Sequence, residues 1–200
     1  MQIHWIKSNP DSTSIGLAEI EEQDESLLES SPELDALHPK KRKEFLASRA
    51  LLKTMCEQLD IPYQGIRKDD FGKPHLIDSS YHISISHSYP MVACAIHPSR
   101  SCGIDIESAR PQLLKIKHKF LNPQELAVCG DDLSKLCLHW AAKETLYKIH
   151  GRKKLIFTKE LAVLSITSKE IKSQIILDTH TENYILKNEY FLEYSLVYSV

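Results

Sequence analysis

The sequence predicts an α+β fold, in which helices and strands share one compact domain or two small lobes. A helical pattern is clear at residues 140–148, which are rich in helix formers and contain no Gly or Pro. A strand pattern is clear at residues 103–107, where isoleucine alternates with acidic side chains. The chain has 200 residues, of which 42% are hydrophobic, so it is long enough to bury a sizeable core.

The overall composition argues against several classes of protein. The formal net charge is -2, whereas a nucleic-acid-binding domain is usually strongly basic. No apolar stretch approaches the roughly 18 residues that a membrane helix needs, and the start of the chain has no long apolar run. The five cysteines include no C-x-x-C pair, which indicates reduced side chains rather than disulfides or a thiolate zinc site. We therefore expect a cytoplasmic protein with no nucleic-acid or membrane partner.

The first sixty residues predict one strand and one long helix. Residues 2–6 alternate as in a strand, whereas residues 19–35 are acidic, weakly patterned and typical of a solvated helix or loop. Pro39 can begin a helix that ends near Leu59. The apolar stripe of this helix contains Phe45, Leu52, Cys56 and Leu59.

Arg49 lies within this apolar stripe. A buried guanidinium group is costly unless it finds anions or carbonyl oxygens. Two interpretations are open: the stem packs while the head reaches an acidic neighbour, or the head binds an anionic ligand.

A turn and a hairpin are predicted after this helix. Residues 71–74 contain a Gly and a Pro in positions that favour a tight turn. Residues 81–86 alternate and residues 91–96 are continuously apolar, so the two segments predict a hairpin that turns at residues 88–90.

Ser86 and His87 stand at the end of the first hairpin strand. At that position a hydroxyl and an imidazole could reach a phosphate group. They could equally complete the hydrogen bonds of the strand end, and without further information this second interpretation is favoured.

The second half of the chain predicts helices followed by strands. The polar residues 98–101 form the best boundary between two lobes, and residues 110–120 form a helix. Asn122 can cap a further helix that begins at Pro123. Four strands complete the sheet, at residues 161–166, 171–177, 184–187 and 190–200.

The helix at residues 140–148 has a polar face that needs a polar environment. At about 100° per residue, five side chains fall within an arc of roughly 140°. They are Trp140, Lys143, Glu144, Tyr147 and Lys148. Because the opposite side is apolar, the helix is expected to be buried, and a ligand-filled cleft would accommodate its charged face.

Two carboxylates of the predicted strand complement this helix. Asp105 and Glu107 are two residues apart, so they point the same way with a spacing of roughly 6.6 Å. Together with Glu144 they would suit Mg²⁺, which prefers a few carboxylates and completes its shell with water and phosphate oxygens. A surface strand beside a solvated helix with ordinary ion pairs explains the same pattern equally well.

Four motifs occur in a characteristic order along the chain. They are residues 72–74 (Gly-Lys-Pro), 83–88 (Ile-Ser-Ile-Ser-His-Ser), 103–107 (Gly-Ile-Asp-Ile-Glu) and 140–148 (Trp-Ala-Ala-Lys-Glu-Thr-Leu-Tyr-Lys). Their order and spacing resemble the 4'-phosphopantetheinyl transferase superfamily, in particular its two-lobed, surfactin-synthetase-activating branch. The resemblance is clear from about Phe45 to Gly151.

This resemblance implies a pseudo-twofold fold of two similar α/β lobes, residues 1–98 and 99–200, with the site between them. It implies transfer of 4'-phosphopantetheine from coenzyme A to a serine of an apo acyl- or peptidyl-carrier protein. Asp105, Glu107 and Glu144 would hold Mg²⁺. Glu144 is also the candidate base for the serine proton, and Lys148 would neutralise or protonate the departing phosphate.

The resemblance also implies contacts to coenzyme A. Arg49 would face the 3'-phosphate, and Lys148 would lie at the reacting phosphates. Further phosphate contacts would come from Lys73, Ser86, His87 and Lys143. For Lys143 a pair with an acidic neighbour is the open alternative. Phe120 and Glu125 match the pattern that precedes the last motif.

Two other functions remain open at this point. A non-catalytic module that binds coenzyme A or a carrier protein would keep the fold without the chemistry. An unrelated Mg²⁺-dependent phosphohydrolase would explain the carboxylates, but not Arg49, Lys73 and His87 together. Since one chain would supply both lobes, we expect a monomer.

Overall fold

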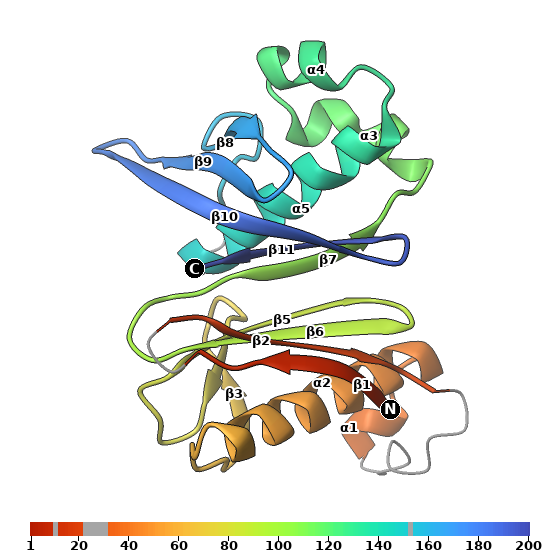
Figure 1. Cartoon of the computed structure of the whole chain (residues 1–200), viewed down its shortest axis with the longest axis vertical. Helices are drawn as coiled ribbons and strands as arrows, with labels where there is room; N and C mark the ends of the chain where they lie inside the picture. The colour runs from red at the N-terminus through yellow and green to blue at the C-terminus, as the bar shows by residue number, and fades with distance from the viewer. Residues whose placement is uncertain (10–11, 22–31, 152–153) are drawn as a thin grey trace.

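The computed structural model describes residues 1–9, 12–21, 32–151 and 154–200. Its centre consists of two antiparallel sheets, and helices cover their outer faces (Figure 1). This is the α+β architecture that the sequence predicts. No helix in the described ranges combines the length and the apolar character needed to cross a membrane.

The first sheet has six strands in the order β1-β2-β6-β5-β4-β3. They are β1 (Gln2–Lys7), β2 (Ser14–Glu19), β3 (Ile66–Lys68), β4 (Pro74–Leu76), β5 (His82–Ser88) and β6 (Met91–His97). Strands β5 and β6 form the expected hairpin, with Ser88 opposite Met91. Helix α1 (Pro32–Asp35) precedes α2 (Pro39–Gln58), which packs on one face of this sheet.

The second sheet has five strands in the order β7-β11-β10-β9-β8. They are β7 (Ile104–Ser108), β8 (Leu161–Ile166), β9 (Glu170–Ile176), β10 (Thr181–Phe191) and β11 (Tyr194–Ser199). Helices α3 (Gln112–Phe120), α4 (Pro123–Cys129) and α5 (Leu133–His150) belong to the same half. Helix α5 packs on the outer face of this sheet, as α2 does on the first (Figure 1).

The two sheets face each other across a shared apolar core. Ile15 and Leu17 of the first sheet pack with Ile104, Ile106 and Leu196 of the second. At the edge of this core Lys7 forms an ion pair with Glu189, so side chains of β1 and β10 contact each other across the two sheets. The layers therefore run helix, sheet, sheet, helix.

Side-chain hydroxyls join the sheets where β7 meets β5. Ser84 Oγ accepts a hydrogen bond from the Ile104 amide at 3.1 Å, and Ser86 Oγ accepts one from the Ile106 amide at 3.3 Å. These alternate serines replace the backbone ladder that a continuous sheet would have. The chain passes from one sheet to the other just before this joint, between His97 and Ile104.

Two strand assignments made from sequence were wrong. The sequence predicts no strand at residues 14–18 and a solvated segment from residue 19, yet β2 is a central strand. It is buried on both faces, so its sequence shows no alternation. Asn188 and Glu189 resemble a turn, but they pair with β11 inside the continuous strand β10. The turn lies instead at Leu192, which has a φ of 53°. Residues 22–31 of the expected acidic segment lie outside the described residues.

The helix boundaries follow the expected capping chemistry. Asn122 and Glu125 form a reciprocal capping box at the start of α4, with Pro123 in the first turn. The side chain of Asp132 accepts hydrogen bonds from the amides of Ser134 and Lys135 at the start of α5. All five cysteines are buried and free, as the sequence indicates.

Candidate active site

Asp105 occupies the middle of β7 and is only 3% exposed. Its Oδ1 atom accepts hydrogen bonds from Ser86 Oγ at 2.8 Å and from Lys148 Nζ at 2.7 Å. Its Oδ2 atom is buried and has no hydrogen-bond partner among the described residues. Since buried polar atoms are nearly always paired, this oxygen indicates a place for a ligand.

The close approach of β7 to α5 depends on Gly103. A Cβ atom at this position would collide with the carbonyl oxygen of Thr145. Because the glycine lets the strand run close under the helix, Lys148 can reach both Asp105 and the carbonyl oxygen of Ile104, the latter at 2.8 Å.

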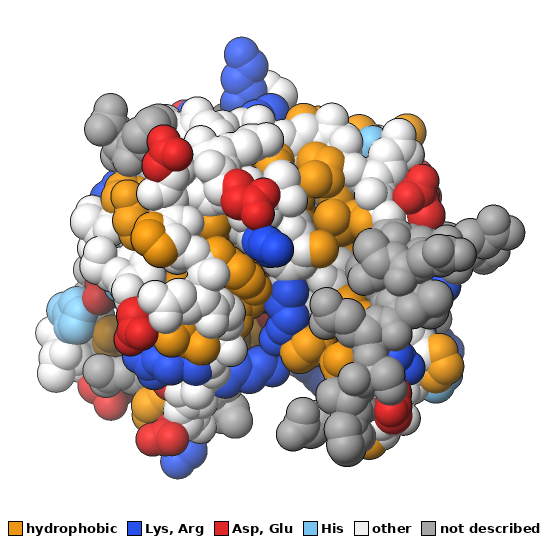
Figure 2. Space-filling view, turned by 90° about the horizontal axis from the view of Figure 1, so that it is seen from below, with side chains coloured by type: hydrophobic (Ala, Val, Ile, Leu, Met, Phe, Trp, Pro, Cys, Tyr) orange, Lys and Arg blue, Asp and Glu red, His pale blue; other side chains and the backbone are white. Residues whose placement is uncertain are grey.

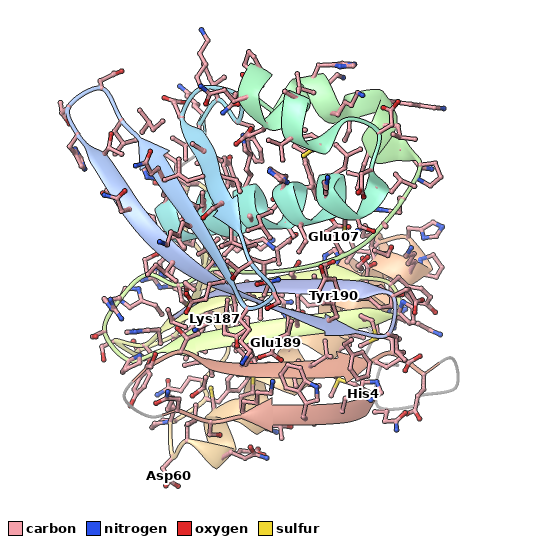
Figure 3. The ribbon with its side chains drawn as sticks, turned by 45° about the horizontal axis from the view of Figure 1, so that its top comes forward. His4, Asp60, Glu107, Lys187, Glu189 and Tyr190 are labelled. Carbon is pink, nitrogen blue, oxygen red and sulfur yellow. The ribbon has the colours of Figure 1, made fainter. Side chains whose placement is uncertain are left out.

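Glu107 lies two residues after Asp105, beneath the helical layer (Figure 3). It accepts hydrogen bonds from Trp140 Nε1 at 3.1 Å and from the guanidinium group of Arg110. Burial raises the pKa of Glu107, and the negative charge of Asp105 raises it further.

Glu144 comes from α5 and completes the acidic group. Burial raises its pKa to about 7, and the charges of Asp105 and Glu107 add to this effect while Lys148 opposes it. Among the described residues, no group of His, Cys, Asp or Glu side chains already has the geometry of a metal site. The chemistry nevertheless fits Mg²⁺: the negative charge of Asp105 disfavours ionisation of both Glu107 and Glu144, and one buried oxygen of Asp105 lacks a partner among the described residues.

Ser86 and His87 point to opposite faces of β5, as neighbours on a strand must. Ser86 is 6% exposed, and its hydroxyl donates a hydrogen bond to Asp105 and accepts one from the Ile106 amide. In the ligand-free chain its hydroxyl holds Asp105, and its expected phosphate contact stays a prediction. The half-exposed His87 lies on the α2 side, 3.4 Å from Glu44, and burial lowers its pKa.

Arg49 on α2 faces the same side as His87. Its guanidinium group stacks on the Phe45 ring at 3.1 Å and donates to the Phe45 carbonyl oxygen at 3.0 Å. Among the described residues, no carboxylate lies within ion-pair distance of it. Carbonyl and ring contacts thus hold the cation without neutralising it, and the open alternative of an acidic partner is not realised.

Two neighbouring cavities connect these groups. One of about 200 Å³ is lined by residues from the 71–74 turn, from β5 and from the end of α5, including Lys73 and Lys148. The other, of about 350 Å³, is lined by Arg49 and His87. Both cavities include Gly72, Pro74 and Ile85 in their walls, so they lie side by side. Lys and Arg side chains gather around a hollow on the face seen in Figure 2.

Lys143 is a correction to the expected site. Although it shares the helical arc of Glu144, it is fully buried and forms an ion pair with Glu125 at 2.6 Å. Its other two bonds go to the carbonyl oxygens of Phe120 at 2.7 Å and Phe157 at 2.9 Å. All three N–H donors of Lys143 bond to groups inside the protein, and the residue lines neither cavity. Of the two roles predicted for Lys143, the structure shows the ion pair with an acidic residue.

Lys73 also bonds to protein groups. Its ammonium group donates to Ser101 Oγ and to the carbonyl oxygens of Lys148 at 2.9 Å and Ile149 at 3.1 Å. Burial lowers its pKa. It reaches the wall of the smaller cavity with its side chain, but its charge is directed at the end of α5.

Sequence reasoning missed one acidic residue of the site, Glu44. It is 2% exposed and binds both Lys41, at 2.8 Å, and His87. The sequence contains a helical pattern that includes this residue, because Glu44, Ser48, Leu51 and Met55 are three or four positions apart. In the structure all four side chains are buried. Leu52 and Cys56 of the predicted stripe are buried as expected, and the buried face extends one position further on the side of Glu44.

Comparison with known proteins adds an independent observation. Residues 101–196 match the sequence model of the 4'-phosphopantetheinyl transferase superfamily. The chain is 32% identical over 119 residues to 4'-phosphopantetheinyl transferase gsp of Aneurinibacillus migulanus, covering 55% of this chain and 48% of that protein. It is 35% identical over 101 residues to 4'-phosphopantetheinyl transferase Sfp of Bacillus subtilis, covering 48% and 45%.

A third relative is 4'-phosphopantetheinyl transferase HetI of a Nostoc species. It is 29% identical over 127 residues, which cover 56% of this chain and 54% of that protein. The chain thus spans about half the length of the curated relatives it matches. The matched family region contains β7 and α5, which carry all three carboxylates of the candidate site.

Proposed function

The chain is a member of the 4'-phosphopantetheinyl transferase superfamily through residues 101–196, and from this premise we propose that it transfers the 4'-phosphopantetheine arm of coenzyme A. The acceptor is a serine of an apo acyl- or peptidyl-carrier protein, and the second product is adenosine 3',5'-bisphosphate. One observation carries the proposal: the buried Asp105 is bonded to Lys148, which lines one of two neighbouring cavities, and the other cavity is lined by Arg49, which has no carboxylate partner among the described residues.

Asp105, Glu107 and Glu144 would hold Mg²⁺, which when bound neutralises negative charge at the pyrophosphate of coenzyme A. Ser86 keeps Asp105 oriented by donating to Oδ1, and Trp140 does the same for Glu107. These hydrogen bonds fix the carboxylates before substrate arrives.

Glu144 is the proposed base. A carboxylate on α5, close enough to Asp105 for their charges to interact, can take a proton from the attacking serine hydroxyl. Lys148 lies one helical turn later, and its ammonium group stands beside Asp105 at 2.7 Å. Its proposed role is to neutralise charge on the departing phosphate.

Arg49 and His87 are proposed to hold the 3'-phosphate end of coenzyme A. Both line the larger cavity, whose wall also includes Lys41 and Lys68. Among the described residues, the guanidinium group bonds to carbonyl and hydroxyl groups and stacks on an aromatic ring, and phosphate oxygens would supply the missing negative charge.

The proposed function is tested by incubating the protein with coenzyme A, Mg²⁺ and an apo carrier protein, followed by intact mass measurement. We expect the carrier to gain one phosphopantetheine group, and a chelator to abolish the gain. Loss of phosphate from coenzyme A without transfer would identify a hydrolase instead. No change in either molecule would identify a binding module.

We further propose that the protein acts as a monomer in the cytoplasm. One chain supplies both sheets that border the cavities, and its five cysteines are free. Light scattering should give the mass of one chain, 22.9 kDa. A stable dimer would contradict the proposed monomer.

A further inference from the structure

The ammonium group of Lys73 is bonded to the last turn of α5, far along the chain from its own turn. It donates to the carbonyl oxygens of Lys148 and Ile149 and to Ser101 Oγ. An ammonium group has three protons, and all three are used in these bonds. Lys73 therefore cannot donate to a further acceptor without releasing the helix or Ser101.

The end of α5 needs such donors. The last carbonyl groups of a helix have no partner within the helix and carry partial negative charge. The Gly151 amide bonds to the Tyr147 carbonyl oxygen at 3.0 Å, and Ser101 Oγ donates to that of Ile149. Lys73 donates the hydrogen bond that the Lys148 carbonyl oxygen accepts. Among the described residues, it is the only side-chain cation bonded to the end of α5.

The local backbone on both sides is arranged for this contact. At Gly151 the φ angle is 71°, and a Cβ atom would lie 2.5 Å from Cδ of Lys73 and 2.9 Å from its Nζ. Within the turn at Lys73, Asp69 Oδ1 accepts the amides of Phe71 at 3.0 Å and Lys73 at 2.9 Å. A rigid turn thus delivers the lysine into a space that only glycine leaves open.

We propose that Lys73 is a positioning residue that fixes the end of α5, and with it Glu144 and Lys148, against the first sheet. The turn that carries Lys73 connects β3 and β4 of that sheet, whereas α5 packs on the second. The inference rests on the proposed function for its catalytic consequence, but the contact itself exists without any substrate.

A positioning role and a phosphate contact of Lys73 predict different effects on KM, on kcat and on the free protein. A phosphate contact acts only when coenzyme A is bound, so its loss raises KM and leaves the free protein unchanged. A positioning contact acts in the free protein, and its loss misplaces the catalytic side chains. A small misplacement lowers kcat with little change in KM.

The first experiment measures hydrogen exchange in the ligand-free protein. In Lys73→Met, amides of residues 147–151 should exchange roughly tenfold faster or more, because charge-assisted bonds to the helix end are lost. Lys53→Met, which removes an exposed lysine from α2, should exchange like wild type. Lys73→Arg, which keeps the cation, should recover most of the protection. This readout needs no substrate, so its failure is distinct from failure of the proposed function.

The second experiment measures transfer kinetics. We expect kcat of Lys73→Met to fall roughly tenfold or more, while KM for coenzyme A stays within about twofold. A tenfold rise in KM with unchanged exchange in the free protein would overturn the proposal in favour of a phosphate contact.

A double-mutant cycle tests the contact between Lys73 and Gly151 independently of the transfer kinetics. Gly151→Ala strains the backbone in any background, but only in the presence of Lys73 does it also displace the side chain. The acceleration of exchange by Gly151→Ala should therefore be several-fold larger in wild type than in Lys73→Ala. Equal accelerations in the two backgrounds would overturn the proposal.

Discussion

Glu144 carries a carboxyl group whose pKa is raised to about 7, first by burial and then by the negative charge of Asp105. In the unfolded chain the same group has its ordinary pKa near 4.5. The folded protein therefore holds this proton more tightly than the unfolded chain does. Ionisation of Glu144 opposes folding when no cation is present.

The first prediction is a pH dependence of stability in the metal-free protein. As pH rises from about 4.5 to about 7, the unfolded chain releases the proton first, so the free energy of unfolding should fall. The loss attributable to Glu144 should reach about 3 kcal/mol and then stay constant above pH 7. Denaturant melts in the presence of a chelator at several pH values measure it.

The control is Glu144→Gln, which keeps the shape of the side chain but cannot ionise. Its stability should decline less over this pH interval than that of wild type. Identical pH profiles for the two proteins would contradict the raised pKa.

The second prediction concerns Arg49. A charge-assisted contact to a phosphate contributes about 1.5 to 3 kcal/mol, so Arg49→Ala should raise KM for coenzyme A roughly tenfold or more. Its effect on kcat should be small, because the 3'-phosphate is remote from the bond that breaks. Steady-state kinetics with coenzyme A and dephospho-coenzyme A separate the two effects.

Wild type should prefer coenzyme A over dephospho-coenzyme A, and Arg49→Ala should show much less preference. If the variant discriminates as strongly as wild type, Arg49 does not meet the 3'-phosphate. Its packing on Phe45 would then be its whole role.

At the scale of elements, α5 shows what a helical pattern predicts about the surroundings of its side chains and what it does not. The pattern places Lys143 and Glu144 on one arc, and both are indeed near each other on the helix. However, α5 packs against the second sheet on one side and against α3 and α4 on another. Because neighbours surround the helix, a shared arc does not mean a shared environment, and Lys143 faces Glu125 instead.

The third prediction tests this buried pair. Lys143→Met leaves the carboxylate of Glu125 buried without its cation, and such a loss typically costs about 3 to 5 kcal/mol. The double variant Lys143→Met with Glu125→Gln removes the remaining charge and should be more stable than Lys143→Met alone. Chemical denaturation of the single and double variants measures the difference.

Lys135→Met provides a matched control on the same helix. Lys135 is exposed, and its contacts to Val128 and Asp132 are solvent-accessible, so its loss should change stability by less than about 0.5 kcal/mol. An equal cost for Lys135→Met and Lys143→Met would contradict the special role of the buried pair.

Local signals in the sequence predicted the elements that begin and end with strong caps or turns. Helix α4 starts at Asn122 and Pro123, and α5 ends at Gly151, as expected. Strand β2 was missed because a strand buried on both faces has no alternation. The serine contacts to β7 were also missed, because they depend on how two distant strands meet, which no local pattern specifies.

At the scale of the whole molecule, the candidate site lies where the two sheets meet rather than within either. Arg49 and His87 belong to the first half, and Asp105 and Lys148 to the second. Coenzyme A bound along both cavities would therefore contact both halves. Its binding energy would add to the stability of the complete layered structure.

The fourth prediction is that coenzyme A raises the melting temperature in one cooperative transition. At a ligand concentration of about one hundred times Kd, stabilisation is about 2.7 kcal/mol, which corresponds to roughly 5 to 10 °C for a chain of this size. Differential scanning calorimetry with and without coenzyme A measures the shift.

The same shift should be smaller for Arg49→Ala at equal ligand concentration. If coenzyme A moved only one of two separate transitions, the ligand would contact only one half of the molecule. That outcome would contradict a binding site shared between the sheets.

The hydroxyls of Ser84 and Ser86 accept hydrogen bonds from alternate amides of β7, and these bonds specify the register between the two sheets. A slip of two residues would set the Ile104 amide opposite Ser86 and take Asp105 away from that hydroxyl. The bond between Ser86 and Asp105 therefore forms only when the two sheets are aligned correctly. The serines that align the sheets thus also orient the carboxylate that we propose to hold Mg²⁺.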